Sequence, residues 1–227
     1  MQPSPTSTHE RCLKRLFPSG VRVVMATQEI WSSSLHPDEL PLMANAVPAR
    51  RRAFAAGRAC SRAALARLGV AAGSLLPDAD RIPRWPAGAV GSISHTEDAC
   101  AAAVAKSCEF LSLGLDLEAR RWLPAEVERR VCTADELGES ARLSEAKPWT
   151  TAIFGAKECF YKCYFPVVRR FLDFSDVHVA LDPERSTFSA TLVGDGLPGI
   201  DGQRSFEGRL VWTEDLVMCG ISLARCT

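Results

Sequence analysis

The chain has 227 residues, enough for one large domain or two small ones, and either arrangement can bury a hydrophobic core. Its 27 basic and 27 acidic residues cancel, so no overall attraction to nucleic acid or to an anionic membrane is expected. No run of about 18 apolar residues could span a membrane, and the N-terminal stretch lacks the apolar segment of a signal peptide. We therefore expect a cytoplasmic protein without a membrane span that does not bind nucleic acid.

The cysteine and histidine content argues against a metal site built from thiolates or imidazoles. The nine cysteines are an odd number without a CxxC pair, which favours reduced thiols that pack as small hydrophobes. Four histidines are too few and too scattered for a histidine-built centre. A hard cation held by oxygen ligands remains open.

The first part of the chain predicts one strand and one helix. Residues 1–20 are polar, with scattered proline and serine, and we expect a flexible N-terminal segment there. The apolar run 21–28 predicts a short strand. The Ala-, Leu- and Arg-rich stretch 47–70 predicts a helix that Gly69 ends.

A proline-rich loop and a segment of small residues follow that helix. The loop covers residues 77–88. The segment 99–106 is rich in alanine, so it is compatible with a strand or with a helix, and we favour the strand. A turn should then lead into another strand that starts at residue 110.

The stretch 110–122 has leucine at every second position, the period of a strand with one buried face. These residues are Leu111, Leu113, Leu115 and Leu117. Asp116 and Glu118 share the opposite face, where two carboxylates repel each other. Such a pair lowers its energy by facing water at the edge of a sheet, by binding a cation or by protonating.

The second half predicts helices followed by antiparallel strands. Thr133 and Glu136 have the spacing of a capping box. An aromatic helix is expected to open near Pro148 and to stop at Pro166. Short runs rich in β-branched residues predict antiparallel strands at 176–182, 187–193, 209–212 and 216–223. The pattern as a whole predicts an α+β protein.

Glu158 and Lys162 are the first candidates for a functional site. They stand four residues apart, so they lie on one face of the predicted helix in the order that favours an ion pair. A surface pair is the ordinary interpretation. The aromatic residues around the pair favour a site instead, and they are Phe154, Phe160, Tyr161, Tyr164 and Phe165.

Two further segments are candidates for phosphate binding. In GSISH, Ser94 and His95 follow small residues that allow a ligand close to the backbone, although a turn with a solvated histidine has the same pattern. The helix at 47–70 carries a row of arginines, which is either a solvated face or a set of guanidinium groups for phosphate. The row comprises Arg50, Arg51, Arg58 and Arg62.

Four segments stand in a fixed order between residues 50 and 165: RRRAFAAGR, PRWPAGAVGSISH, GLDLE and FGAKECFYK. Together they resemble the phosphopantetheinyl transferases, in particular the single-chain type similar to enterobactin synthase component D. Each segment is weak evidence alone, but the four in this order are specific. The chain departs from the family in the loop before PRWP, where members often have a basic residue and a glycine and this chain has Asp80 and Arg81.

The resemblance implies two pseudosymmetric lobes, each a small antiparallel sheet with a packed helix, and an active site in the cleft between them. Residues 21–112 would form an N-terminal lobe that binds coenzyme A. Residues 113–227 would form a C-terminal lobe that binds the metal and carries the catalytic groups. We find no residue-level repeat between the halves, and we expect a monomer.

The resemblance also implies the chemistry. The 4′-phosphopantetheine group of coenzyme A would pass to a serine of an apo-acyl or peptidyl carrier protein, and adenosine 3′,5′-bisphosphate would leave. Asp116, Glu118 and Glu158 would hold Mg²⁺, a hard cation that prefers oxygen ligands. Glu158 would take the serine proton, and Lys162 would neutralise the diphosphate or assist the leaving group. The carrier could belong to a fatty-acid, polyketide, nonribosomal peptide or siderophore system.

The coenzyme A contacts that the resemblance implies come from both halves of the chain. They are Arg50, Arg58, Arg81, Ser94, His95, Asp116 and Lys162. Within this set, Ser94 and His95 would hold phosphates, while Arg50 and Arg58 would hold the 3′-phosphate.

Two other classes of protein fit part of the pattern. A Mg²⁺-dependent phosphodiesterase or nuclease could use the same three carboxylates, but it would usually present a broad basic groove, which a neutral chain does not favour. A non-catalytic module that binds coenzyme A or a carrier protein would not need both Glu158 and Lys162. The sequence therefore favours the transferase.

Overall fold

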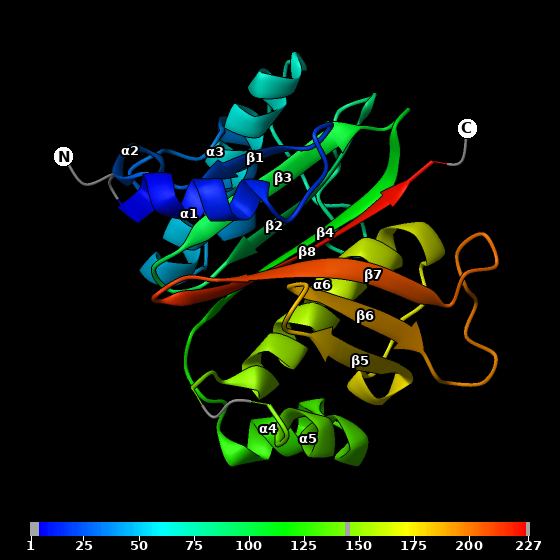
Figure 1. The fold of residues 1–227 in the computed structure, drawn as a ribbon. Coiled ribbons are helices and arrows are strands. Elements are labelled where there is room, and N and C mark those ends of the chain that lie inside the picture. The colour runs from blue at the N-terminus through cyan, green and yellow to red at the C-terminus, as the bar shows by residue number, and fades with distance from the viewer. Residues whose placement is uncertain (1–4, 144–145, 226–227) are drawn as a thin grey trace.

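The computed structural model describes residues 5–143 and 146–225, which form two antiparallel sheets with helices packed against them (Figure 1). The first sheet has the order β1-β3-β2 and the second the order β4-β8-β7-β6-β5. The strands are β1 (Arg22–Met25), β2 (Ala89–His95), β3 (Cys100–Lys106), β4 (Phe110–Ala119), β5 (Val177–Asp182), β6 (Thr187–Leu192), β7 (Ser205–Trp212) and β8 (Leu216–Ala224). The predicted α+β class is confirmed.

Helices cover both sheets, and the longest helix of each half packs on the sheet of that half. Helix α3 lies on the first sheet and helix α6 on strands β4 and β8 of the second. The helical segments are α1 (Pro5–Lys14), α2 (Gln28–Trp31), η1 (Pro37–Met43), α3 (Pro48–Leu68), α4 (Ala125–Val131), α5 (Ala134–Ser140), α6 (Trp149–Val168) and η2 (Phe174–Asp176). None of the helices in the described residues is long and apolar enough to cross a bilayer.

Several predicted elements are confirmed at or near their predicted bounds. Helix α3 ends as predicted at Gly69, whose φ of 79° suits a residue without a side chain. The segment 99–106 is a strand, because its alanines are buried between α3 and the core beneath β1 and β3. Thr133 and Glu136 form the predicted capping box of α5. The strand predicted at 209–212 is longer and begins at Ser205.

The structure differs from the sequence prediction at two helices. Within the expected flexible segment 1–20, helix α1 forms and Leu13, Leu16 and Phe17 are buried against β1 and β7, whereas residues 1–4 lie outside the described part. The prediction that the aromatic helix stops at Pro166 is wrong. Helix α6 continues to Val168 and ends where Arg169 adopts a left-handed conformation, so Pro166 occupies its last turn.

Strand β4 lies between two parts of the core. Leu113, Leu115 and Leu117 face the cluster that contains α1 and the first sheet, as the period of two predicts. Leu111 packs against the other cluster instead, because a bulge between Phe110 and Ser112 shifts the register. The opposite face of β4 meets helix α6.

The two sheets meet where β2 lies beside β4. Instead of a ladder of backbone bonds, the buried hydroxyl of Ser92 accepts the N–H of Leu115 at 3.0 Å, and that of Ser94 accepts the N–H of Leu117 at 3.2 Å. Strand β4 is therefore no wet edge strand, because β2 and α6 cover the edge and face that the sequence could assign to water.

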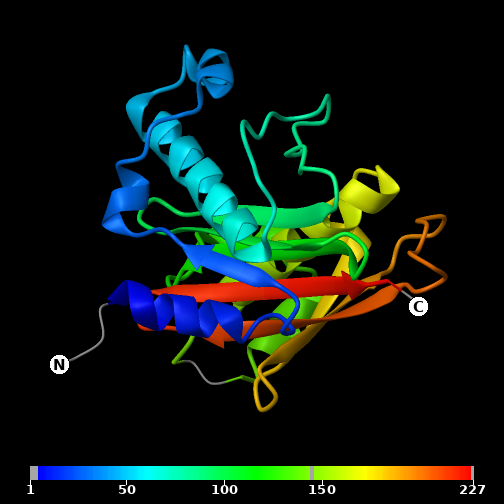
Figure 2. The ribbon, with the colours of Figure 1, turned by 90° about the horizontal axis from the view of Figure 1, so that it is seen from above.

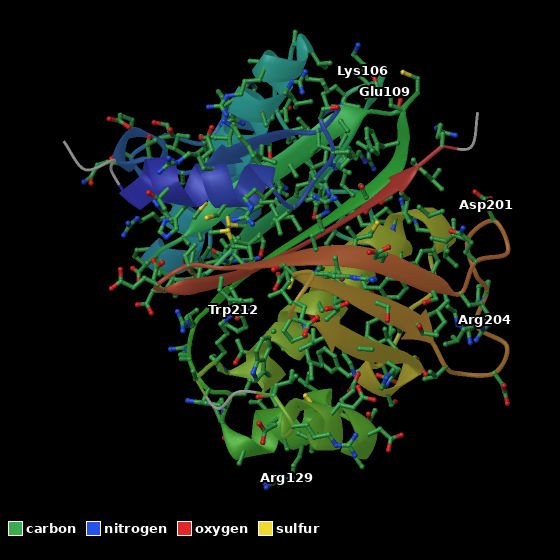
Figure 3. The ribbon with its side chains drawn as sticks, viewed as in Figure 1. Lys106, Glu109, Arg129, Asp201, Arg204 and Trp212 are labelled. Carbon is green, nitrogen blue, oxygen red and sulfur yellow. The ribbon has the colours of Figure 1, made fainter. Side chains whose placement is uncertain are left out.

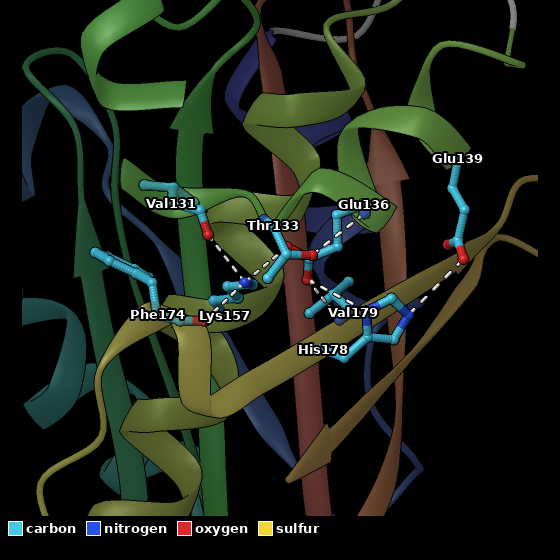
Figure 4. A network of polar contacts seen from close by, with 8 residues as sticks. All are labelled: Val131, Thr133, Glu136, Glu139, Lys157, Phe174, His178 and Val179. Carbon is cyan, nitrogen blue, oxygen red and sulfur yellow. Dashed lines mark hydrogen bonds and ion pairs between the residues drawn. The ribbon is translucent and has the colours of Figure 1, made fainter. Parts of the chain in front are cut away.

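A buried ionic network fixes helix α6 within the second half of the chain (Figure 4). Lys157 is almost fully buried, and its ammonium group donates to the carbonyls of Val131 and Phe174 at 2.9 and 2.8 Å and to Glu136 at 2.8 Å. Glu136, also buried, accepts the N–H groups of Thr133 and Val179. All three donors of Lys157 are thus satisfied.

The close approach of α6 to β4 depends on Gly114. A Cβ atom there would lie 2.0 Å from the carbonyl oxygen of Cys159. We expect Gly114→Ala to lower the free energy of unfolding by about 3 kcal/mol, the upper range for overpacking. Gly138→Ala is the matched control in α5, where nothing lies within 4 Å, and it should raise stability by about 0.5–1 kcal/mol. Urea unfolding of both variants checks this, and equal stabilities would contradict it.

The Lys157 network should contribute strongly to stability. Lys157→Met leaves Glu136 buried without its cation, and we expect a loss of about 3–5 kcal/mol. Lys106→Met is the control, since Lys106 is exposed at the end of β3 (Figure 3), and its effect should stay within about 0.5 kcal/mol. If Lys157→Met does not fold, Lys157→Met combined with Glu136→Met should recover a folded protein. Similar urea midpoints for the two lysine variants would contradict the expectation.

Candidate active site

The predicted site residues from both halves of the chain meet around one cavity of about 730 Å³. The hairpin at 80–83 and strand β2 line it from the first half, and β4 and α6 line it from the second. The predicted residues that line it are Arg50, Arg81, Ser94, His95, Asp116, Glu118, Glu158 and Lys162. Arg58 is the one predicted site residue that is not among those lining the cavity.

Asp116 and Lys162 form the centre of the site. The ammonium of Lys162 lies 2.6 Å from Oδ1 of Asp116 and 3.2 Å from the hydroxyl of Ser94, which itself donates to the same Oδ1 at 2.9 Å. Asp116 is only 3% exposed, so the interpretation that it faces water is wrong. Its other oxygen, Oδ2, is buried and has no hydrogen-bond partner within the described residues.

Burial and neighbouring negative charge disfavour the ionised forms of Glu118 and Glu158. Burial raises the pKa of Glu118 to about 8, and Asp116 adds to the shift. Burial also raises the pKa of Glu158, again with a contribution from Asp116. Both carboxyl groups therefore hold a proton more readily than ordinary glutamates, which is the response expected of clustered acids without a cation.

Lys162 forms its ion pair with a residue of strand β4 and not with a neighbour on its own helix. The predicted pair of Glu158 and Lys162 shares one cavity, but no ion pair joins them among the described residues, and Lys162 bonds to Asp116 on β4 instead. Burial lowers the pKa of Lys162, but the charge and hydrogen bond of Asp116 outweigh burial, so the pKa is raised. Lys162 is thus a charged group at the cavity wall at neutral pH.

His95 is held in its neutral form by its surroundings. Burial lowers its pKa, and the positive charges of Arg50 and Lys162 lower it further. The guanidinium of Arg50 lies 3.2 Å from Nε2 of His95. Since a guanidinium can only donate, Nε2 accepts this bond. An anion bound here would reverse these shifts and favour the charged imidazole that the sequence analysis expects.

The row of arginines on α3 divides into different environments. Arg58 is buried with its guanidinium 4.4 Å from the ring centroid of Phe54, and burial lowers its pKa to about 10. Its Nε has no hydrogen-bond partner within the described chain. Arg62 pairs at 2.9 Å with Glu39, a fully buried acid that the sequence analysis missed. Only Arg50 of this row reaches the cavity.

The carboxyl groups suit a hard cation, although their side chains are not gathered as a finished metal site. Within the described residues no group of three His, Cys, Asp or Glu side chains is placed to hold a metal ion. Two observations nevertheless fit Mg²⁺: the buried Oδ2 of Asp116 has no partner within the described residues, and burial together with the negative charge of Asp116 raises the pKa of Glu118. Oxygen donors of this kind, completed by water and phosphate, are what Mg²⁺ prefers.

Comparison with known proteins identifies the chain. The fold brings acidic and basic groups from both halves of the chain into one cleft. A family model for the 4′-phosphopantetheinyl transferase N-terminal domain matches residues 38–105, and one for the 4′-phosphopantetheinyl transferase superfamily matches residues 112–201. The chain belongs to the 4′-phosphopantetheinyl transferase superfamily, as its sequence motifs predict.

Three curated relatives carry the same activity in their names. The chain is 40% identical over 197 residues to 4′-phosphopantetheinyl transferase Svp of Streptomyces mobaraensis, covering 85% of this chain and 80% of the relative. It is 31% identical over 221 residues to Npt of Nocardia iowensis, covering 93% and 100%. It is 33% identical over 189 residues to PptT of Mycobacterium tuberculosis, covering 78% and 83%. The enzyme class is therefore that of a 4′-phosphopantetheinyl transferase, and the alternative of a non-catalytic module is set aside.

The pair of Asp116 and Lys162 should be energetically coupled. Asp116→Ala leaves the partly buried ammonium of Lys162 without its partner, and we expect a loss of about 1–3 kcal/mol in the free energy of unfolding. The Lys162→Met change should cost a similar amount, and the double variant should cost clearly less than the two single costs combined. Urea unfolding of the four proteins measures this coupling. Strictly additive costs would show that the two groups do not stabilise each other.

Proposed function

We propose that this protein transfers the 4′-phosphopantetheine group of coenzyme A to a serine of an apo-acyl or peptidyl carrier protein, with Mg²⁺, and releases adenosine 3′,5′-bisphosphate. The observation that carries the proposal is the buried Asp116, whose one oxygen binds Lys162 and whose other oxygen lacks a partner, beside Glu118 and Glu158 in one cavity. Three acids and an ammonium group in one cleft suit a diphosphate with a divalent cation.

Asp116, Glu118 and Glu158 would hold Mg²⁺. When bound, the cation would neutralise negative charge on the phosphate oxygens of coenzyme A. The proton that Glu118 retains in the absence of a cation would be released on binding, because a positive charge favours the ionised carboxylate.

Positive groups around these acids would bind the substrate. Lys162 would contact the diphosphate and His95 would lie beside its phosphate oxygens, while Ser94, whose hydroxyl already bonds Asp116 and Lys162, would line the pocket there. Arg50 and Arg81 would bind the 3′-phosphate, because their guanidinium groups line the cavity and that of Arg58 does not. Arg58 instead packs on Phe54, one turn earlier on the helix that carries Arg50.

Glu158 is suited to accept the proton of the attacking serine. The serine oxygen would attack the β-phosphorus of coenzyme A, form a new P–O bond and displace adenosine 3′,5′-bisphosphate, while the proton passes to Glu158 directly or through water. Lys162 would balance the charge that gathers on the departing phosphate.

A second cavity adjoins the first beside Glu158. This cavity of about 340 Å³ shares Glu158, Tyr161 and Phe171 with the first. Leu172, Phe174 and Val177 are among the residues that line it. The lining also includes Arg130, Lys157, Asp173 and Ser175, so the extension is of mixed polarity. Such a space next to the proton acceptor is compatible with a long substrate whose reacting phosphorus lies at Glu158.

Glu158→Gln tests the proposed function. The residue makes no ion pair in the described part of the chain, so glutamine should leave the melting temperature nearly unchanged. Loss of the proton acceptor and of a cation ligand should slow the chemical step by about a hundredfold or more. The measurement is single-turnover transfer at saturating coenzyme A and Mg²⁺, followed by the mass of an apo-carrier protein.

Glu184→Gln is the control for this experiment, since Glu184 is exposed in the turn between β5 and β6. Its single-turnover rate should equal that of the wild type. Rates within about threefold of each other for the two variants would contradict the role of Glu158. Failure of the wild type to modify any of a panel of apo-carrier proteins would contradict the proposed transfer itself.

A further inference from the structure

Residues 76–84 form a hairpin in the first half of the chain that one carboxyl group organises. Oδ1 of Asp78 accepts the backbone N–H groups of Asp80 at 3.0 Å and Ile82 at 2.9 Å. Arg81 at the tip has a φ of 66°, a left-handed conformation that residues with side chains adopt uncommonly. The hairpin is therefore well defined internally, and its position relative to the rest of the protein needs separate contacts.

Arg169 supplies such a contact from the second half. Its Nη1 lies 2.7 Å from Oδ2 of Asp78 and 2.8 Å from Oδ2 of Asp80. Asp78 thus uses one oxygen to build the hairpin and the other to bind α6. The hydrogen bond from Arg169 lowers the pKa of Asp78, in agreement with an ionised pair.

The position of Arg169 suits a connection between the halves. It caps the C-terminal end of α6, where its left-handed backbone (φ 57°) turns the chain and its N–H bonds to the carbonyl of Phe165. Figure 2 shows the hairpin rising from the sheets on the same side as the end of α6. The two acids are 91 and 89 residues away in sequence, so this contact is purely tertiary.

Hairpin and helix end form facing parts of the cavity wall. Asp80, Arg81, Ile82 and Pro83 line the cavity from the hairpin. Phe165, Pro166 and Phe171, near the end of α6, line the same cavity. Arg169 is not among the lining residues, so it acts on the cavity through the hairpin.

We propose that Arg169 is a positioning residue that clamps hairpin 76–84 to the end of helix α6 and thereby holds Arg81 against the bound coenzyme A. The inference rests on the proposed function for the identity of the ligand. The clamp itself rests only on the contacts of Arg169, Asp78 and Asp80.

The clamp should matter more for binding than for folding. Arg169 is roughly half exposed, with 46% of its side chain accessible, and exposed ion pairs contribute little to global stability. Binding should be more sensitive to loss of the clamp than folding is. A hairpin that moves away from α6 would carry Arg81 away from the ligand. The expected signature is a raised KM for coenzyme A with an unchanged kcat and melting temperature.

The first experiment measures transfer kinetics with coenzyme A, Mg²⁺ and an apo-carrier protein. Arg169→Gln should raise KM for coenzyme A by about three- to tenfold, and Arg169→Lys should restore most of the loss because it keeps the charge. Arg170→Gln is the matched control, since it removes the same charge one residue away from an exposed position. Its KM should equal that of the wild type.

A double-variant cycle tests whether the residues act together. Asp80→Asn alone should also raise KM, and combining it with Arg169→Gln should add little, because both changes remove the same contact. Additive effects on KM, or equal effects of Arg169→Gln and Arg170→Gln, would overturn the clamp.

The second experiment needs no coenzyme A. Trypsin can cleave after Arg81 and Arg84 in the hairpin, and release from α6 should expose these bonds more often. We expect cleavage between residues 81 and 85 to be several-fold faster in Arg169→Gln than in Arg170→Gln, as measured from fragment masses over time. Equal cleavage rates would overturn the clamp whatever the ligand. If Arg169→Gln is cleaved faster than Arg170→Gln but the wild type does not bind coenzyme A, the proposed function is contradicted and the clamp is still supported.

Discussion

One buried carboxylate oxygen, Oδ1 of Asp116, joins three elements of this protein. It accepts a hydrogen bond from Lys162 on α6 and another from Ser94 on β2, while Asp116 itself belongs to β4. The hydroxyl of Ser94 also accepts the N–H of Leu117, so its donor and both of its lone pairs are used. A buried charge is costly unless it is paired and hydrogen-bonded. The two sheets and α6 are therefore held in the one arrangement that satisfies this group.

The same arrangement places the cleft. Helix α6 can approach β4 because Gly114 leaves room for its backbone. At this distance Lys162 reaches Asp116, and Glu158, four residues earlier, reaches the same cavity. The residues of the site come together because Gly114 lets the helix and strand pack closely.

The sequence predicted the helices, the strands and most residues that line the cavity. It predicted less well how buried each of these residues is and what it contacts. Composition and the terminal Gly69 located α3, and the period of two located β4, because a buried face repeats along a strand. Burial of Asp116 could not be predicted in this way, since it depends on β2 and α6 covering β4. The resemblance implies Arg58 as a phosphate contact, and this stays a prediction; in the structure Arg58 packs on Phe54, one turn earlier in α3, and does not line the cavity.

Helix α6 shows why one motif can contain two different kinds of residue. In the segment FGAKECFYK, Lys157 and Lys162 are five residues apart, so their side chains point about 140° apart around the helix. Lys157 turns towards α5 and η2, and its three donors bond to Glu136 and to two backbone carbonyls. These bonds anchor the helix in its own half of the protein. Glu158 and Lys162 are separated by only about 40° and both turn into the cavity. Helix geometry alone therefore divides the motif into an anchoring lysine and a pair that faces the substrate, and the anchor is what gives that pair a fixed position.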